Sequence, residues 1–290
     1  MIKEILKRVL ESQPLQKVYP YLRRLEIPER VYKHLRPRGI FNAKTDIYNF
    51  NIYHYGCHIE NTLYWTGFYE KNTLILWSRI ARLSNVIMDV GANTGIFSLA
   101  AKSANKKAQV YAFEPQNLVY KMLNKNIEIN RFDIISRNFG LSDQERDVQL
   151  WVTEGDNAPG ASINPDLEYW KNIPNKKTIP IEVRRGDNFL REQGIDQVDL
   201  IKMDVEGHEP YALEGLGQYL HSMPSPTLIV EILNESVCAE IKRIVSINKY
   251  LFYFIDESLG LIKLNDLTFY KMGNYLICED IICQRLGLSN

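Results

Sequence analysis

The stretch Val86-Ile87-Met88-Asp89-Val90-Gly91-Ala92-Asn93-Thr94-Gly95 decides the fold of this chain. Its first five residues, four apolar ones and Asp89, are typical of a buried parallel strand. Gly91 and Gly95 then predict a tight turn, and residues 96–104 have the composition of a helix. A strand that enters a helix through a glycine turn brings bare backbone N–H groups beside a ligand. The turn reads Asp-x-Gly-x-Asn-x-Gly, so the G-x-G-x-x-G fingerprint of dinucleotide-binding proteins is absent here.

Strand-like and helical segments alternate downstream of this stretch. The expected strands cover residues 86–90, 109–113, 134–139, 200–204 and 227–232, and the expected helices 96–104, 118–130 and 236–247. This alternation predicts an α/β fold with a doubly wound, mostly parallel sheet. It breaks after Gly140, where a strand-like run at 148–152 predicts a hairpin in place of a helix. Residues 153–177 show little periodicity, and long loops beside such sheets are often lids or substrate loops.

The part of the chain before the glycine turn has a different pattern. Apolar residues recur at helical spacing over residues 2–10, and prolines divide residues 14–37 into short helical pieces. Aromatic and β-branched residues alternate over 41–55, which predicts a β ribbon beside the main sheet. We therefore expect an N-terminal helical and β-ribbon extension over residues 1–64 and one large domain over residues 65–290.

Charge is balanced over the whole chain but unevenly distributed. With 35 basic and 35 acidic residues the formal net charge is zero, which provides no basic footprint for nucleic acid. Residues 1–38, however, contain ten Lys or Arg and four Glu. Two interpretations stay open for this arm: a solvated helix face, or a segment that self-associates or docks on a phosphate-bearing partner or a membrane surface.

The sequence favours a cytoplasmic protein. No apolar run approaches the ~20 residues of a membrane-spanning helix, and the N-terminus lacks the apolar core of a secretory signal. Cys57, Cys238, Cys278 and Cys283 match neither a disulfide framework nor paired zinc spacing, so we expect buried reduced thiols. An arm that docks on a membrane would place the protein at its inner face.

Two acidic residues are expected to lie close to the glycine turn. Glu114 ends the next expected strand, 19 positions after Gly95, where an acidic residue of a doubly wound sheet reaches the ribose of a bound nucleoside. Two ribose hydroxyls that donate to one carboxylate form strong, charge-assisted hydrogen bonds. Alternatively, Glu114 is a surface carboxylate that is favoured by the dipole of the following helix. Asp89 lies inside the apolar strand and needs donors there. It either supports the turn or contacts the amine of the ligand.

A second constellation, Lys202-Met203-Asp204-Val205-Glu206-Gly207-His208-Glu209, follows a later buried strand. Asp204 and Glu206 are two apart on extended backbone and therefore project to one side. They lie at the carboxyl end of a strand, where α/β sheets bind ligands. So many ionisable groups in a short segment favour an acid–base or metal site. For His208, catalysis and a capping role both stay open.

Together these segments resemble the FkbM family of S-adenosylmethionine-dependent methyltransferases. The resemblance rests on five segments that occur in order: 89–95, Phe113-Glu114-Pro115, 140–143, 202–209 and 228–231. It covers about residues 65–285, and Asp-Val-Glu-Gly-His-Glu at 204–209 is its most specific element. Gly140 departs mildly from the family pattern, which commonly has Ala before Leu-Ser-Asp.

The resemblance implies a class I methyltransferase (Rossmann-like) fold, S-adenosylmethionine as cofactor, and O-methylation of a hydroxyl on a sugar, glycan or related natural product. By the family pattern the turn holds the methionine end of the cofactor, Glu114 the ribose, and the segment around Leu141 the adenine. The expected cofactor-binding residues are Asp89, Gly91, Asn93, Gly95, Glu114, Leu141, Ser142 and Asp204.

Methyl transfer to an alkyl hydroxyl requires a base or a cation, because the hydroxyl ionises poorly. The expected catalytic residues are Asp204, Glu206, His208 and Glu231. Two schemes stay open: a His208 base with carboxylate support, or Mg²⁺ held by Asp204 and Glu231.

Other readings of the chain remain as alternatives. An NAD-dependent oxidoreductase also uses a glycine turn and a downstream acid, and a non-catalytic module would bind the cofactor or a glycan without methyl transfer. Trp151, Tyr169 and Trp170 are candidates for stacking on a sugar face of the acceptor.

Overall fold

The computed structural model describes residues 8, 12–153, 161–163, 176–247 and 249–287. The expected first helix, apart from Arg8 and Ser12, and the aromatic residues Tyr169 and Trp170 lie outside the described residues. Of the expected 153–177 loop, residues 154–160 and 164–175 lie outside them as well.

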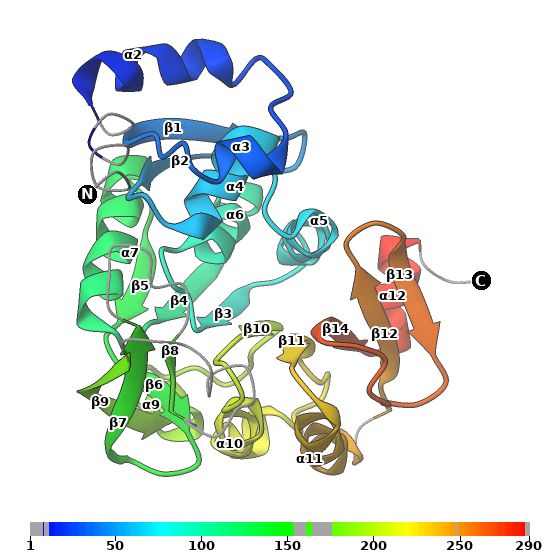
Figure 1. Cartoon of the computed structure of the whole chain (residues 1–290). Helices are drawn as coiled ribbons and strands as arrows, with labels where there is room; N and C mark the ends of the chain where they lie inside the picture. Colours follow the sequence, from blue (N-terminus) through cyan, green and yellow to red (C-terminus); the bar gives the residue numbers. More distant parts are fainter. Residues whose placement is uncertain (1–7, 9–11, 154–160, 164–175, 248, 288–290) are drawn as a thin grey trace.

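One sheet of eight strands forms the centre of the molecule, in the order β5-β4-β3-β10-β11-β14-β12-β13 (Figure 1). The strands are β3 (Val86–Val90), β4 (Gln109–Phe113), β5 (Ile134–Arg137), β10 (Leu200–Met203), β11 (Thr227–Ile232), β12 (Leu251–Asp256), β13 (Gly260–Leu264) and β14 (Gly273–Cys278). The first five strands in this order pair in parallel. The last three pair antiparallel. The sheet therefore has the α/β, doubly wound character that the sequence predicts.

The point where the strand order reverses lies between β3 and β10. From β3 the chain continues outward to β4 and β5, and it later returns to β10 on the other side of β3. In open α/β sheets, ligands bind in the crevice at the carboxyl ends of the strands at such a point. The topology thus selects the edge formed by Val90 and Met203 for a site.

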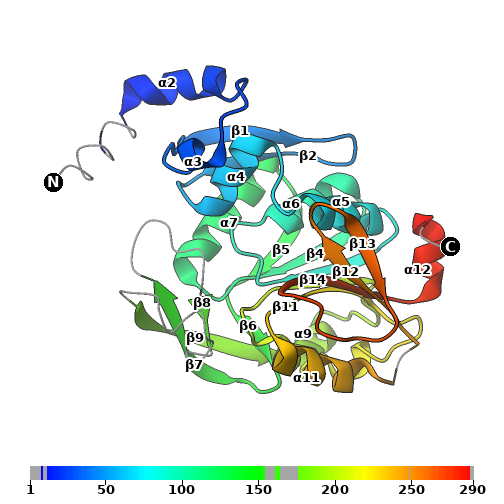
Figure 2. The same cartoon turned by 45° about the vertical axis from the view of Figure 1, so that its right-hand side comes forward.

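Helices cover both faces of the sheet (Figures 1 and 2). One face carries α5 (Lys71–Ala81), α6 (Ile96–Ala104) and α7 (Asn117–Asn130), and the other carries α9 (Gly186–Glu192), α10 (Glu209–Glu214) and α11 (Glu235–Val245). Side chains alternate along β3, so that Ile87 joins the first core and Met88 and Val90 join the second. Because both faces are covered, the strand is apolar along nearly its whole length.

The N-terminal ribbon packs on helices rather than beside the main sheet. Its strands β1 (Gly39–Lys44) and β2 (Asn49–His54) form a separate antiparallel pair. The backbone N–H groups of Asn51 and Tyr53 donate to the Asn130 and Asn126 side chains of α7 at 2.7 and 2.8 Å. Side-chain acceptors therefore satisfy the edge strand that a neighbouring strand would otherwise pair.

The expected hairpin after Gly140 is wrong. A second sheet has the order β6-β9-β7-β8, so β9 (Lys176–Arg185) lies between β6 (Gly140–Ser142) and β7 (Arg146–Thr153). The last strand, β8 (Ala161–Ser162), pairs with β7. Leu150, Val152, Ile181 and Val183 form a small core of this sheet, which explains why β7 takes the distant β9 as its partner.

The remaining elements are α2 (Gln13–Leu22), α3 (Glu29–Tyr32), α4 (His58–Thr66), a 3₁₀ turn at Gly217–Tyr219 and α12 (Asp280–Leu286). Tyr19 of α2 and Leu63 of α4 join the same core as α5–α7, and the domain boundary at residue 64 stays a prediction.

In the part of the chain that the structure describes, every helix is too short or too polar to cross a membrane.

Candidate functional site

A cavity of about 170 Å³ opens at the carboxyl ends of β3 and β10. Its wall contains residues 90–94 and 96–97 of the glycine turn and helix α6, residues 114–116 after β4, and residues 204–206 after β10. Ile59, Tyr69 and Glu70 line it from the N-terminal side, and Leu150, Ala161 and Ile163 line it from the second sheet.

The structure brings most of the expected site residues into this cavity. Eight of them line it: Gly91, Asn93, Glu114, Leu141, Asp204, Glu206, His208 and Glu231. Asp89, Gly95 and Ser142 do not belong to its lining, although each lies next to residues that do. Segments separated by more than a hundred residues thus meet at one point.

Gly91 allows the turn and the acidic segment to touch. Its φ is +81°, and a Cβ added there would lie 1.9 Å from the carbonyl oxygen of Asp204. The backbone N–H of Asp204 donates to the carbonyl of Val90 at 3.0 Å. A side chain at position 91 would therefore be strained twice, by its dihedral angle and by the neighbouring loop.

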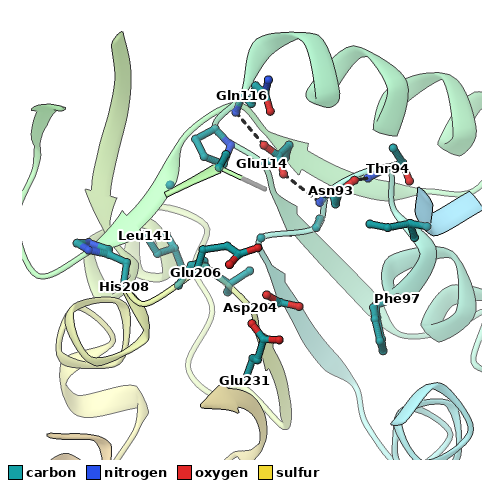
Figure 3. A pocket seen from close by; sticks show the side chains of 18 of the residues that line it. Asn93, Thr94, Phe97, Glu114, Gln116, Leu141, Asp204, Glu206, His208 and Glu231 are labelled. Carbon is teal, nitrogen blue, oxygen red and sulfur yellow. Dashed lines mark hydrogen bonds between the residues drawn. The ribbon is translucent and has the colours of Figure 1, made fainter. Parts of the chain in front are cut away.

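Glu114 lies across the cavity from the acidic segment and holds the turn (Figure 3). Its two carboxylate oxygens accept backbone N–H groups of Asn93 at 3.0 Å and Gln116 at 2.8 Å. Burial raises the pKa of Glu114 to about 7, although these hydrogen bonds oppose the shift. The side chain is only 7% exposed and still reaches the cavity wall.

Asp89 and Gly95 support the glycine turn through contacts with helices α6 and α7. The Asp89 carboxylate accepts the Ser98 hydroxyl of α6 at 2.5 Å, and burial raises the pKa of Asp89 to about 6. Gly95, at φ +98°, precedes α6, and a Cβ there would meet the Leu123 side chain at 2.6 Å. In this structure both residues contact the protein itself, and their roles toward a ligand stay predictions.

Three carboxyl groups lie together on one side of the cavity: Asp204, Glu206 and Glu231 (Figure 3). Asp204 pairs with the ammonium of Lys202 at 3.1 Å, and the Lys202 side chain is 1% exposed. Burial alone would lower the pKa of Lys202, but the neighbouring carboxylates, Asp204 first, raise it. Burial and the Asp204 charge raise the pKa of Glu231 to about 10. Glu231 therefore keeps its proton near pH 7.

His208 lies apart from these carboxyl groups, beyond Leu141 (Figure 3). Its Nε2 lies 2.9 Å from the Ser142 hydroxyl, and its ring stacks on Tyr211 with centroids 4.8 Å apart. Burial lowers the pKa of His208 to about 4, so the ring is neutral near pH 7. The geometry joins His208 to the expected adenine segment, and its role as a catalytic base stays a prediction.

Tyr69 and Glu70 are lining residues that the sequence analysis missed. Glu70 precedes α5 with φ +42°, and its Oε2 accepts the Asn274 amide at 2.9 Å. Burial first, and then the charges of Glu70, Asp204 and Glu231, raise the pKa of Tyr69, and all four residues line the cavity. Nothing in the local sequence marks these residues, because they come from a loop before an ordinary amphipathic helix.

The second sheet closes one wall of the cavity. The Ser162 hydroxyl of β8 donates to the carbonyl of Glu206 at 2.8 Å, and Leu150, Ala161 and Ile163 supply apolar surface. Part of the segment expected as a lid or substrate loop thus contributes to the site.

The expected Mg²⁺ site finds no support in this arrangement. Among the described residues, no group of three or more His, Cys, Asp or Glu side chains could hold a metal ion. The Lys202 ammonium pairs with Asp204 at 3.1 Å, and its charge also acts on Glu231, so both expected ligands already interact with a protein cation.

Comparison with known proteins gives a family match over the region that builds the cavity. A family described as "Methyltransferase FkbM domain" matches residues 89–254. The chain is 32% identical to the Methyltransferase sdnD of Sordaria araneosa over 46% of this chain and 60% of that protein. It is 26% identical to the Hexuronic acid methyltransferase AglP of Haloferax volcanii (56% and 62%) and 27% identical to the 2-O-methyltransferase NoeI of Sinorhizobium fredii (45% and 56%). The chain thus spans about 60% of the length of these relatives.

Solved structures show a more distant likeness. A SAM-dependent methyltransferase from Agrobacterium tumefaciens aligns at 10% identity with a TM-score of 0.43, covering 83% of this chain and 70% of that one.

Proposed function

Because this chain belongs to the FkbM methyltransferase family, we propose that it transfers a methyl group from S-adenosylmethionine to a hydroxyl of a sugar, glycan or related natural product. One observation carries the proposal: the glycine turn, Glu114 and the carboxyl groups of Asp204, Glu206 and Glu231 line one cavity. A relative whose name specifies a hexuronic acid supports a sugar-type acceptor, and a relative named a 2-O-methyltransferase supports transfer to an oxygen.

The residues at one end of the cavity fit the proposed cofactor. Gly91 lines the cavity, and because it has no side chain the methionine end can approach its backbone closely. Glu114 reaches the cavity and has carboxylate oxygens that can accept ribose hydroxyls. Leu141 offers apolar surface to an adenine ring, and the neutral His208 and Ser142 lie beside it.

When bound, the cofactor supplies a sulfonium-activated methyl group, so the protein's task is positioning and removal of a proton. The acceptor oxygen must lie in line with the methyl–sulfur bond. We infer that the Asp204 carboxylate receives the hydroxyl proton, because it lines the cavity and Lys202 pairs with it at 3.1 Å. Glu231, which keeps its own proton, donates a hydrogen bond that orients the acceptor oxygen.

Mass spectrometry provides the direct test. The protein is incubated with S-adenosylmethionine and a pool of glycans, glycosides and nucleotide sugars, and products heavier by one CH₂ are sought. The proposal expects such a product, dependent on both protein and cofactor. Tight binding of S-adenosylhomocysteine without transfer to any acceptor would favour the non-catalytic module.

Calorimetry separates the oxidoreductase alternative. Titration with S-adenosylhomocysteine and with NAD should show binding of the first alone. Binding of NAD in preference to S-adenosylhomocysteine would contradict the proposed function.

A further inference from the structure

The charged side chains of the cavity wall are all acidic among the described residues. Of the residues that the structure describes, five line it with carboxyl groups, Glu70, Glu114, Asp204, Glu206 and Glu231, and no described Lys or Arg lines it. Lys202 is 1% exposed, and its ammonium is paired with Asp204 beneath the wall. His208 is neutral near pH 7. A ligand with a negative charge would therefore meet no cation of these residues in this cavity.

The proposed cofactor accounts for only one end of this wall. Glu114 lies beside the glycine turn, whereas Asp204, Glu206 and Glu231 gather on the opposite side (Figure 3). Glu70 joins that side, because its carboxyl group accepts the amide of Asn274, the residue that faces Glu231 across β14 and β11. Burial raises the pKa of Glu70, and the Lys202 charge opposes the shift. The turn at Tyr69–Glu70 precedes residues 89–254, so it lies outside the part of the chain that matches the family.

Polar groups at this end of the cavity can exchange hydrogen bonds with ligand hydroxyls. The Asn274 amide donates to Glu70 at 2.9 Å, while its Oδ1 is buried with no hydrogen-bond partner in the described structure; Asn274 is 6% exposed. Asn274 also pairs with Glu231 in the register of β14 and β11. Carboxylate oxygens, a protonated carboxyl and a phenol offer acceptors and donors to hydroxyls. A carboxylate placed among them would be desolvated beside like charges.

We propose that Tyr69, Glu70, Asp204 and Glu231 form the acceptor subsite and select acceptors that carry no negative charge around the reacting hydroxyl. Sugars that carry a carboxylate on the same ring are rejected. This inference rests on the proposed function, because it takes the opposite end of the cavity as the cofactor site. It distinguishes this chain from a relative whose name specifies a hexuronic acid.

The test uses matched rings that differ in one group: methyl β-glucoside against methyl β-glucuronide, and the corresponding galactose pair. Saturation-transfer NMR on the full chain with S-adenosylhomocysteine at pH 7.5 measures binding, and mass spectrometry with S-adenosylmethionine measures transfer. We expect the neutral member of a pair to bind or react at least tenfold better. Equal or better binding of the glucuronide or galacturonide would overturn the inference.

Two variants examine the role of Glu70. The charge reversal Glu70→Lys should strengthen binding of the carboxylated sugar relative to its neutral partner at least tenfold. The isosteric Glu70→Gln should bring the ratio of the two affinities closer to one than in the wild type. Glu128→Gln, on the exposed face of α7, serves as the matched control and should leave the ratio unchanged. A ratio that stays at the wild-type value in both Glu70 variants contradicts the assignment.

Failure of this inference is distinguishable from failure of the proposed function. If S-adenosylhomocysteine binds but no neutral hexoside shows saturation transfer, the subsite assignment is overturned and the cofactor site stands. If S-adenosylhomocysteine does not bind, the proposed function fails and the inference fails with it.

Discussion

Glu114 combines burial with a proposed contact to the ribose, so its ionisation should control cofactor affinity. Its pKa of about 7 means that the carboxylate dominates above pH 7 and the neutral acid below. Charge-assisted hydrogen bonds are roughly twice as strong as neutral ones, and the acid form has one acceptor fewer. Affinity should therefore fall as the pH decreases through 7.

We expect S-adenosylhomocysteine to bind up to about tenfold more weakly at pH 6 than at pH 8, since one pH unit below the pKa leaves about a tenth of the group ionised. Calorimetric titration at both pH values measures this ratio. In Glu114→Gln, which cannot ionise, affinity should be low and nearly independent of pH. A wild-type protein whose affinity is the same at pH 6 and pH 8 would count against the ribose contact.

Asp204 and Glu231 lie in the same cavity but should respond differently to amide substitution. Glu231 keeps its proton near pH 7, and glutamine has nearly the same shape as a protonated glutamate. Glu231→Gln should therefore retain kcat within about tenfold, whereas Asp204→Asn removes the proposed proton acceptor and should lower kcat by about 10²–10⁴-fold. Turnover of the acceptor found by mass spectrometry gives both values. Equal losses of kcat in the two variants would contradict the assignment of the proton to Asp204 alone.

Lys202 supplies a positive charge to both of the carboxyl groups that were expected to hold Mg²⁺. A bound divalent ion would have to displace that ammonium or share its partners. We expect methyl transfer to continue at its full rate in excess EDTA. Loss of transfer in EDTA, restored by added Mg²⁺, would revive the metal scheme.

At the level of elements, the contact between the glycine turn and the end of β10 depends on a missing side chain. Gly91→Ala forces a left-handed dihedral on alanine, which costs about 1–2 kcal/mol, and places a methyl group 1.9 Å from a backbone oxygen. The two loops must separate, so unfolding free energy should fall by more than 2 kcal/mol and S-adenosylhomocysteine affinity at least tenfold.

Gly194→Ala is the matched control for this prediction. Gly194 also has a positive φ, +66°, but nothing lies within 4 Å of an added Cβ. It should lose about 1 kcal/mol of stability and no affinity. Urea unfolding and calorimetry measure the two quantities, and similar losses in both variants would mean that the turn–loop contact is not the cause.

The elements around the turn show which local signals are sufficient. Helix α6 and strand β4 begin and end at the residues expected from the sequence, 96–104 and 109–113. Their boundaries follow from glycine chemistry and from runs of apolar residues, which act within a few positions. The hairpin after Gly140 failed because β7 pairs with β9, and that choice depends on a core shared by Leu150 and Ile181.

At the scale of the whole molecule, helix α2 belongs to the packed structure rather than to a solvated arm alone. Tyr19 is fully buried, and its ring forms a T-shaped pair with the Trp65 ring, with the centroids 5.9 Å apart. Part of the basic segment 1–38 therefore packs on the core. Its docking on a membrane or on a second copy stays a prediction.

Tyr19→Ala should lower the free energy of unfolding by about 3–5 kcal/mol, as other large-to-small substitutions of buried aromatic residues do. Tyr21, on the same helix, is 68% exposed, and Tyr21→Ala should change stability by no more than about 0.5 kcal/mol. Urea denaturation of both variants gives the comparison. Equal stability of the two would mean that α2 detaches from the core in solution.

The sequence by itself determined the alternation of strands and helices, the glycine turn, and the positions of the acidic residues at 114 and in the 204–209 segment, because these depend on short-range patterns of polarity and backbone freedom. Only the tertiary structure decided that Tyr69 and Glu70 complete the cavity, that Lys202 pairs beneath it, and that His208 turns toward Ser142. These arrangements depend on contacts between segments far apart in the chain. Such contacts are set by how whole faces pack, and a local pattern of residues does not encode them.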